Sequence, residues 1–163
     1  MELSKIVSSK ATIRFQDCDP FNHLNNASYI NYFMNHREDQ LIEAYDIDIY
    51  AMARKSGKSW VLNSNQIAYI KPAFLMENVI IESQLIAFDK SNLKAEMRMY
   101  NTDKTHLKSI IWCGFTYFNL LKQYKEIHTE EFMALFKSIL NPIEDTYFEN
   151  RILNIRQNKN LII

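Results

Sequence analysis

The chain has 163 residues, of which 47% are hydrophobic and 13% aromatic, so it can fill a core and is not a disordered chain. Its 19 lysine and arginine residues balance 19 aspartate and glutamate residues, which argues against a nucleic-acid-binding protein, because such a protein needs a basic surface. Only 2 glycines and 3 prolines occur, which excludes the glycine-rich loops that bind phosphate.

The N-terminal segment carries charges and lacks the apolar stretch of a secretory signal. No run approaches the roughly 18 consecutive apolar residues of a membrane span. The two cysteines, Cys18 and Cys113, form no CxxC motif, so we expect reduced thiols. These features favour a cytoplasmic location.

The first predicted strand covers residues 11–15, where Ala11, Ile13 and Phe15 alternate with polar residues. The following segment, 17–26, is polar and contains a proline, which predicts an ordered loop.

A long helix is predicted from Ala27 to about Tyr45, with Asn26 as its N-cap. This stretch has no glycine or proline. Its apolar residues cover a wide arc, which favours burial on more than one side; they are Tyr29, Ile30, Phe33, Met34, Leu41, Ile42 and Tyr45.

A polar stretch around 54–59 precedes a change to a period of two. The turns at 89–92 and 101–104 are short, so the last three strands should form an antiparallel meander. Pro72 should end one ladder, and Gly114 indicates a bulge or the close approach of another backbone. The predicted strands are 60–71, 78–88, 93–101 and 107–121.

Thr129 caps a second amphipathic helix, which should end before Pro142. The tail 143–163 holds apolar residues that could pack, while residues 157–160 look loose. Repeats and linkers are absent, so the chain is interpreted as one domain, 1–163. Strands that follow one early helix predict the α+β class with an antiparallel sheet.

The segment 14–33 is the most informative for function, because it brings reactive groups next to an apolar helix. The start of a helix offers unpaired N–H donors and partial positive charge, which favour a developing oxyanion. Two carboxylates, an imidazole and two amides occur within ten residues: Asp17, Asp19, His23, Asn25 and Asn26.

Two runs carry a family resemblance. The first is Asp17-Cys-Asp-Pro with His23-Leu-Asn-Asn, Tyr29 and Tyr32-Phe; the second is Ile67-Ala-Tyr-Ile-Lys-Pro-Ala73 with Asn78-Val-Ile-Ile-Glu82. Together they resemble hotdog-fold thioesterases of the 4-hydroxybenzoyl-CoA thioesterase-like branch. The resemblance covers about residues 8–140 and leaves 141–163 as a C-terminal extension. It implies a five-stranded antiparallel sheet wrapped around one long helix; the C-terminal helix predicted after Thr129 falls partly or wholly outside the resemblance.

The resemblance implies hydrolysis of an acyl-CoA or acyl-carrier-protein thioester to a free acid and a thiol. The catalytic carboxylate of the family maps onto Asp19, as nucleophile or as general base. The oxyanion donors map near Asn25 to Ala27. A thiol leaving group has a pKa near 8.5, so no strong general acid is required.

Supporting or substrate-orienting roles fall to Asp17, His23, Asn25 and Asn26. Asp17 either lies on the same side as Asp19 or shapes the loop. His23 could act as a base, orient the substrate or fasten the loop. A metal site from Cys18, His23 and an aspartate would have too few ligands, so neither a metal nor a cofactor is expected.

Lys71, Arg54 and Lys58, with Lys55, are candidates for contacts with the CoA phosphates, and a solvated basic edge is the alternative. Several relatives carry a carboxylate within the helix where this chain has Met34, so the chain would depend on Asp19 alone. The family implies a homodimer or tetramer, and uncovered strand edges favour the same arrangement.

Two other functions stay open. The lack of a helix carboxylate leaves room for a non-catalytic acyl-thioester-binding accessory protein. Hotdog enoyl-CoA hydratases place Asp and His five residues apart, whereas His23 lies six residues after Asp17 and four after Asp19, so a hydratase fits poorly.

Overall fold

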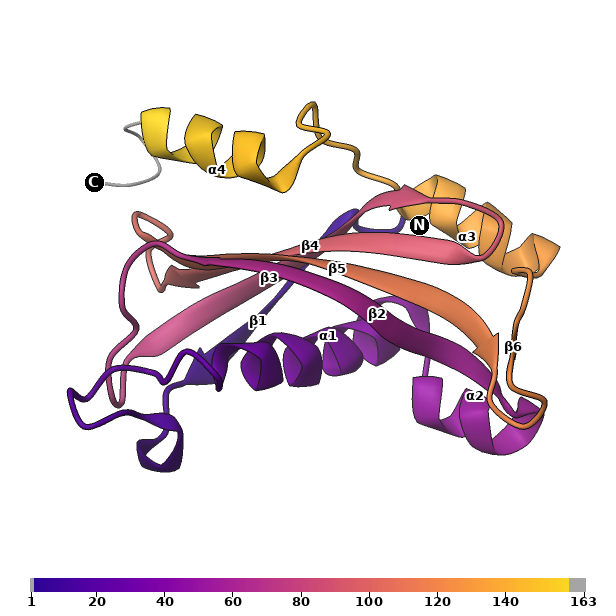
Figure 1. Cartoon of the computed structure of the whole chain (residues 1–163), viewed down its shortest axis with the longest axis horizontal. Helices are drawn as coiled ribbons and strands as arrows, with labels where there is room; N and C mark the ends of the chain where they lie inside the picture. The colour runs from indigo at the N-terminus through magenta and orange to yellow at the C-terminus, as the bar shows by residue number, and fades with distance from the viewer. Residues whose placement is uncertain (1, 159–163) are drawn as a thin grey trace.

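A computed structural model describes residues 2–158, and in it a curled antiparallel sheet holds the long helix α1 on its concave face (Figure 1). Helix α4 lies over the opposite face. The elements are β1 (Ile6–Thr12), η1 (Phe15–Asp17), α1 (Tyr29–Tyr45), α2 (Ile49–Ser56), β2 (Lys58–Tyr69), β3 (Asn78–Phe88), β4 (Asn92–Asn101), β5 (Leu107–Asn119), β6 (Tyr124–Lys125), α3 (Glu130–Ile139) and α4 (Phe148–Gln157).

The main strands follow the order β1-β3-β4-β5-β2, and the short β6 pairs with β5. The α+β class, the hotdog arrangement and the β3–β4–β5 meander are therefore confirmed. The four later strands start and end within two residues of the predicted limits. The sheet has six strands rather than five, because β6 is a two-residue addition that no alternation announces.

The first strand was predicted too late in the chain. It pairs with β3 from Ile6 to Thr12 and ends there. The N–H of Ile13 donates to Glu77 O, and the chain then turns into η1. Phe15 is consequently 79% exposed and does not belong to the core.

Gly114 pairs with Ser64 at a register shift in β2, so the predicted bulge is confirmed, although it lies in the neighbouring strand. A Cβ at Gly114 would collide with the side chains of Ser64 and Asn63. The close approach is thus made by side chains and not by another backbone.

Helix α2 was missed, because residues 54–56 were interpreted as part of a polar stretch. The Asp48 carboxylate caps this helix by accepting hydrogen bonds from Tyr50 N and Ala51 N, at 2.9 and 2.8 Å. Gly57 ends it in the left-handed conformation, with φ of 68°. Asp48 and Gly57 were the available sequence signals. In contrast, the predicted cap of α3 is confirmed, because Thr129 Oγ1 accepts a hydrogen bond from Phe132 N.

The face of α1 that meets the sheet changes from apolar to polar along the helix. Tyr29 and Phe33 are buried in its first half, and Arg37 and Gln40 in its second half. Ile42, which was expected on the apolar arc, is 45% exposed. Sequence hydrophobicity did not identify this polar half, since both buried residues are of types that usually face solvent.

The other face of the sheet is covered by α4, which the sequence did not place. Phe148 and Ile155 pack against a cluster that includes Trp112 of β5. Glu96 of β4, on the strand face that carries the polar residues, is fully buried beneath this layer. Of the stretch expected to be loose, Gln157 ends α4, and residues 159–160 lie outside the described part of the chain.

A buried histidine connects α3 to the sheet. Nε2 of His128 accepts a hydrogen bond from Trp60 Nε1 at 3.0 Å, and its Nδ1 lies 3.0 Å from Asp89 O. Burial lowers the pKa of His128 below its usual 6.5, and the Asp89 carbonyl only partly opposes this effect. A second proton would place an N–H of the ring against the N–H of Trp60.

We therefore expect the contribution of neutral His128 to the free energy of unfolding to be fully present above pH 6.5. This contribution should be lost as the pH drops below that value, since His128 binds the proton more tightly in the unfolded chain. His128→Gln should reduce this loss, measured as the difference in Tm between about pH 7.5 and about pH 5.5. His106→Gln serves as the control. An unchanged pH dependence of Tm in His128→Gln would contradict the assignment of this effect to His128. Burial also lowers the pKa of His36, so part of the pH dependence should remain in every variant.

Candidate active site

The loop before α1 is held by backbone hydrogen bonds to itself and to the segment that follows β2. The N–H of Asp19 donates to His23 O, and the N–H of Leu24 donates to Ala73 O, both at 2.8 Å. Asn22 lies in the left-handed region, with φ of 61°, which asparagine tolerates. The predicted ordered loop is therefore fixed in one conformation next to Pro72 and Ala73.

Asp19 has one carboxylate oxygen engaged and one free of protein partners among the described residues. Its Oδ1 accepts hydrogen bonds from Phe21 N at 2.8 Å and from His23 N at 3.1 Å. This is the geometry of a turn-forming aspartate. The same two bonds also fix the direction of the carboxylate and leave Oδ2 available.

A pocket of about 310 Å³ brings several of the predicted residues together at the start of α1. Asp19, His23, Asn26 and Lys71 all line it, so the loop and the end of β2 share one site. The remaining lining residues are Leu24, Tyr29, Tyr69, Ile70 and Pro72.

The backbone N–H groups around Asn26 differ in availability. The N–H of Asn25 donates to Asp17 O at 2.9 Å, and that of Ala27 donates to Asn25 Oδ1 at 3.0 Å. None of the described residues accepts a hydrogen bond from the N–H of Asn26. Of residues 25–27, which were predicted to supply the oxyanion donors, Asn26 is therefore the one whose backbone N–H is available.

The prediction that the Asn26 side chain caps α1 is wrong. The helix begins at Tyr29 after Ser28, and no side chain caps it. The two residues between Asn26 and the helix form a turn, in which Ser28 N donates to Asn25 O. Asn26 O instead accepts a hydrogen bond from the hydroxyl of Tyr69 at 3.0 Å. Tyr69 lay in the second family motif, but sequence reasoning assigned it no role in the site.

Asp17 does not line the pocket of Asp19. Its Oδ2 accepts a hydrogen bond from the Tyr32 hydroxyl at 2.8 Å, on a neighbouring depression of the surface. Its backbone oxygen accepts from Asn25 N. Of the two options left open by the sequence, this arrangement favours the loop-shaping role.

His23 lines the pocket, and its ring packs edge-to-face against Phe74 with 5.0 Å between centroids. Cys18 points elsewhere, and its Sγ donates to Arg14 O at 3.3 Å. Burial raises the pKa of the Cys18 thiol, and the carboxylates of Asp17 and Asp19 raise it further.

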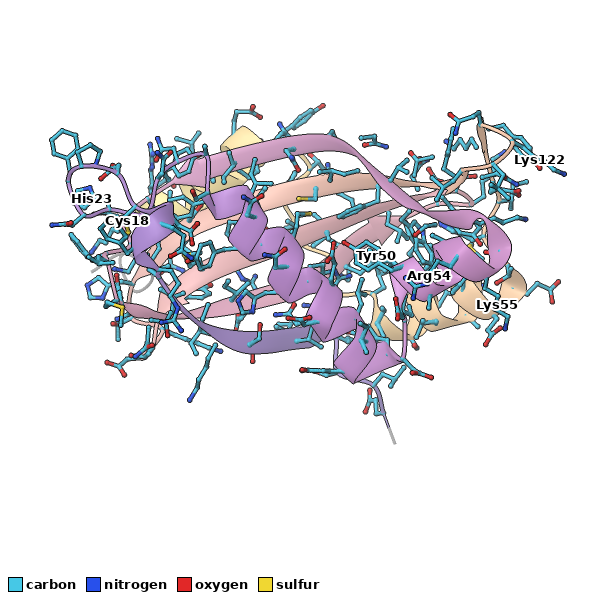
Figure 2. The ribbon with its side chains drawn as sticks, turned by 90° about the horizontal axis from the view of Figure 1, so that it is seen from below. Cys18, His23, Tyr50, Arg54, Lys55 and Lys122 are labelled. Carbon is cyan, nitrogen blue, oxygen red and sulfur yellow. The ribbon has the colours of Figure 1, made fainter. Side chains whose placement is uncertain are left out.

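The basic residues predicted to contact the CoA phosphates do not all lie near one another within one chain. Lys71 lies at the Asp19 pocket, whereas Arg54 lies at the opposite end of the molecule from His23 (Figure 2). Lys58 starts β2 directly after α2 and pairs with Glu126 at 3.0 Å. Residues 2–158 contain no group of three or more His, Cys, Asp or Glu side chains that could hold a metal ion. Among these residues, no helix is both long and apolar enough to cross a membrane.

Comparisons with known proteins agree with this architecture. The chain resembles the 1,4-dihydroxy-2-naphthoyl-CoA thioesterase Slr0204 from Synechocystis, with a TM-score of 0.72 and 8% identity over 82% of this chain and 95% of that one. A Staphylococcus aureus protein solved in complex with CoA gives a TM-score of 0.77 and 14% identity, over 91% and 93% of the two chains. The 12:0-ACP thioesterase from Umbellularia californica gives a TM-score of 0.75 and 9% identity, over 90% of this chain and 54% of that one.

These identities are low, so the structural likeness establishes the fold alone. No curated protein matches the sequence. The family model of the thioesterase-like superfamily, however, matches residues 13–132, which include the loop, α1 and strands β2 to β5. The chain therefore belongs to the thioesterase-like superfamily and is a thioester hydrolase with the hotdog fold.

Proposed function

We propose that the protein hydrolyses an acyl-CoA thioester at the pocket before α1, with Asp19 as nucleophile or general base. The observation that supports this most is the sharing of one pocket by Asp19, His23, Asn26 and Lys71. A carboxylate with one free oxygen thus lies in the same cavity as a residue whose backbone donor is unused.

The chemistry needs few groups. Asp19 either attacks the thioester carbonyl or removes a proton from the water that attacks it. The N–H of Asn26 stabilises the negative charge on the carbonyl oxygen; one such donor is typically worth about 3–4 kcal/mol. Collapse of the tetrahedral species breaks the C–S bond and releases the thiolate, which needs no strong acid because thiols have pKa values near 8.5. If water attacked, the free acid is formed in this step; if Asp19 attacked, the acyl group is left on Asp19 as an anhydride, which a water molecule then hydrolyses to the free acid and the regenerated carboxylate. His23 orients the substrate against this site.

Two observations favour CoA, rather than a carrier protein, as the group that bears the acyl chain of the substrate. Lys71 provides a cation at the pocket, and a structural relative was solved in complex with CoA. Phosphate groups are bound well by lysine and arginine side chains. A carrier-protein thioester stays a second candidate, since one of the structural relatives is an ACP thioesterase.

The direct test is thiol release from a panel of acyl-CoAs that covers short, long and aromatic acyl groups. We expect free CoA and free acid in equal amounts for at least one of them. A change in enoyl absorbance without CoA release would instead indicate a hydratase. Binding without any chemistry would indicate the accessory protein.

Cys18 lies between the two aspartates, and the shifts described above disfavour its thiolate, which is the nucleophilic form of cysteine. We expect Cys18→Ser to retain most of the hydrolytic activity, measured as kcat for CoA release. A loss as large as that of the Asp19 variant would revive a cysteine nucleophile.

We also propose a homodimer formed through β2. The middle of this strand is exposed, and among the described residues β5 is its only strand neighbour. An open edge of twelve residues is normally covered. The other face of the sheet is already occupied by α4, so a tetramer through that face is disfavoured.

This dimer would bring the separated basic residues together. In an antiparallel pair of β2 strands, the start of one strand lies beside the end of the other. The partner's Arg54 and the partner's Lys58 would then approach Lys71 of this chain. The CoA phosphates would thus be bound by both subunits.

Light scattering should give a mass of about twice the 19.4 kDa of one chain. A fully active particle of 19.4 kDa at micromolar concentration would contradict the dimer. The cytoplasmic location stays a prediction.

A further inference from the structure

A second pocket, separate from the Asp19 site, lies between the C-terminal half of α1 and the sheet. Its volume of about 70 Å³ exceeds several times what one water needs, so it has room for the end of a chain but not for a whole acyl group. Its walls are almost entirely apolar and include Met34, Leu41, Trp60, Leu93, Phe115 and Phe136.

One wall of this apolar pocket carries a buried cation, Arg37, which is only 7% exposed. Its Nη1 donates to Ser83 Oγ at 2.9 Å, and this is the single hydrogen bond of the guanidinium group to the described residues. A guanidinium has five N–H donors. Among residues 2–158, the one fully buried side-chain nitrogen or oxygen without a partner belongs to Arg98, so the unpartnered nitrogens of Arg37 retain some accessible surface.

No carboxylate among residues 2–158 forms an ion pair with Arg37. The ionisable groups that influence it are those of Tyr45 and Cys113, and burial lowers the pKa of the guanidinium without neutralising it. A buried cation without a counterion is costly, and an anion that meets it with good hydrogen-bond geometry offsets part of this cost.

Glu38 also lines the pocket, but its Oε1 accepts a hydrogen bond from the hydroxyl of Tyr50 at 2.8 Å. Tyr50 is 55% exposed. The carboxylate of Glu38 is therefore bound to an exposed tyrosine, and Arg37 is the buried charged residue of the pocket.

The stretch of α1 between the Asp19 site and this pocket carries apolar side chains. Ile30 and Met34 are four residues apart within α1 and therefore lie on one side of it. They are half-buried against the core, together with Ile67 and Phe115 of the sheet. From Ile30 to Arg37 the helix rises about 10 Å, a distance that an extended acyl chain can span.

We propose that this pocket receives the far end of the acyl group and that Arg37 binds a carboxylate there, so that the preferred substrates are ω-carboxyacyl thioesters. The inference rests on the proposed thioester hydrolysis at Asp19. A carboxylate matches a guanidinium better than a hydroxyl group does, because it accepts two parallel hydrogen bonds and supplies the missing charge. A methyl end would fill the apolar walls but leave the cation unpaired.

The test compares CoA thioesters of equal length that differ only at the far end: octanoyl with suberoyl, decanoyl with sebacoyl, and dodecanoyl with dodecanedioyl. At the length that fits, kcat/KM should be about tenfold or more higher for the carboxyl-ended member, since a buried polar group rejects a substrate that leaves it unpaired. Equal or lower values at all three lengths, with the methyl-ended thioesters hydrolysed, would overturn the proposal and leave the thioesterase intact.

Variants at Arg37 test whether this residue causes the preference for carboxyl-ended thioesters. Arg37→Met keeps a long apolar stem, and we expect it to abolish the preference while methyl-ended thioesters are still hydrolysed. Arg37→Lys should restore part of the preference. Lys137→Met removes one positive charge from an exposed position on α3, next to Phe136 of the pocket, and should leave the ratio unchanged.

A binding measurement tests the assignment of a carboxylate site to this pocket even if no thioester is hydrolysed. Sebacate should raise the Tm of the wild-type protein more than decanoate does at equal concentration. If no thioester is hydrolysed but sebacate still binds preferentially, the proposed function fails and the pocket assignment stands. An equal effect of sebacate and decanoate on Tm would overturn the pocket assignment.

Discussion

Replacing Glu96 by alanine is expected to lower the free energy of unfolding by about 3–5 kcal/mol, because it removes the only carboxylate that is hydrogen-bonded by two buried or half-buried guanidinium groups among the described residues. Oε1 of Glu96 accepts hydrogen bonds from Arg98 Nη1 at 2.7 Å and Arg151 Nη2 at 2.8 Å. Its Oε2 accepts from Trp112 Nε1 at 2.8 Å and from Arg151 Nε at 2.9 Å.

The cost arises because the cations stay behind when the carboxylate is lost. Burial alone would raise the pKa of Glu96, but the hydrogen bonds from Arg151, the charge of Arg98 and the indole of Trp112 together lower it. Arg151 belongs to α4, so the same substitution loosens the helix that covers the outer face of the sheet.

Urea unfolding at one fixed protein concentration would measure this effect, since a dimer unfolds in a concentration-dependent way. Glu144→Ala, in the exposed segment before α4, is the matched control and should change stability by less than about 0.5 kcal/mol. If Glu96→Ala costs no more than this control, the network does not hold α4 to the sheet.

The sequence predicted the sheet well because the alternation of side chains is a local signal. Leu93, Ala95, Met97 and Met99 define one face of β4 without knowledge of the rest of the chain. The same alternation could not show that the opposite face, with Glu96, is also covered. That depends on where α4 docks, which is a tertiary property.

The two errors in helices α1 and α2 have different origins, one non-local and one local. Arg37 and Gln40 are buried on α1 because Ser83 and Ile81 of β3 accept their hydrogen bonds, and no local pattern contains those partners. Helix α2 was missed although Asp48 and Gly57 are ordinary start and stop signals.

The candidate site was predictable as a set of residues but not as a geometry. The family motif identified Asp19 and the amides near the helix start. Only the backbone hydrogen bonds distinguish the free N–H of Asn26 from the engaged ones of Asn25 and Ala27. The sequence likewise could not show that Arg54 lies far from His23, which shares its pocket with Lys71 (Figure 2).

Asp19→Asn is expected to lower kcat by a factor of about 10² or more, in the range for loss of a positioned base or nucleophile. Asparagine keeps an oxygen that can accept the hydrogen bonds from Phe21 N and His23 N, so the loop should retain its shape. KM should change little, because the acyl and CoA contacts lie elsewhere, and Tm should hold.

Asp17→Asn is the matched control. Its carboxylate meets Tyr32 outside the Asp19 pocket, and asparagine retains an acceptor for that hydroxyl. The kinetic effect should therefore be milder than that of Asp19→Asn, although both variants remove one negative charge from the same loop.

The most direct measurement is kcat for CoA release by the wild-type, Asp19→Asn and Asp17→Asn proteins on one acyl-CoA that the wild type hydrolyses, with Tm recorded for each. A folded Asp19→Asn protein that is slowed about a hundredfold or more, beside an Asp17→Asn protein that is slowed much less, is the predicted result. A folded Asp19→Asn protein with near-wild-type turnover would contradict the role of this carboxylate and make Asp17 or His23 the next candidate.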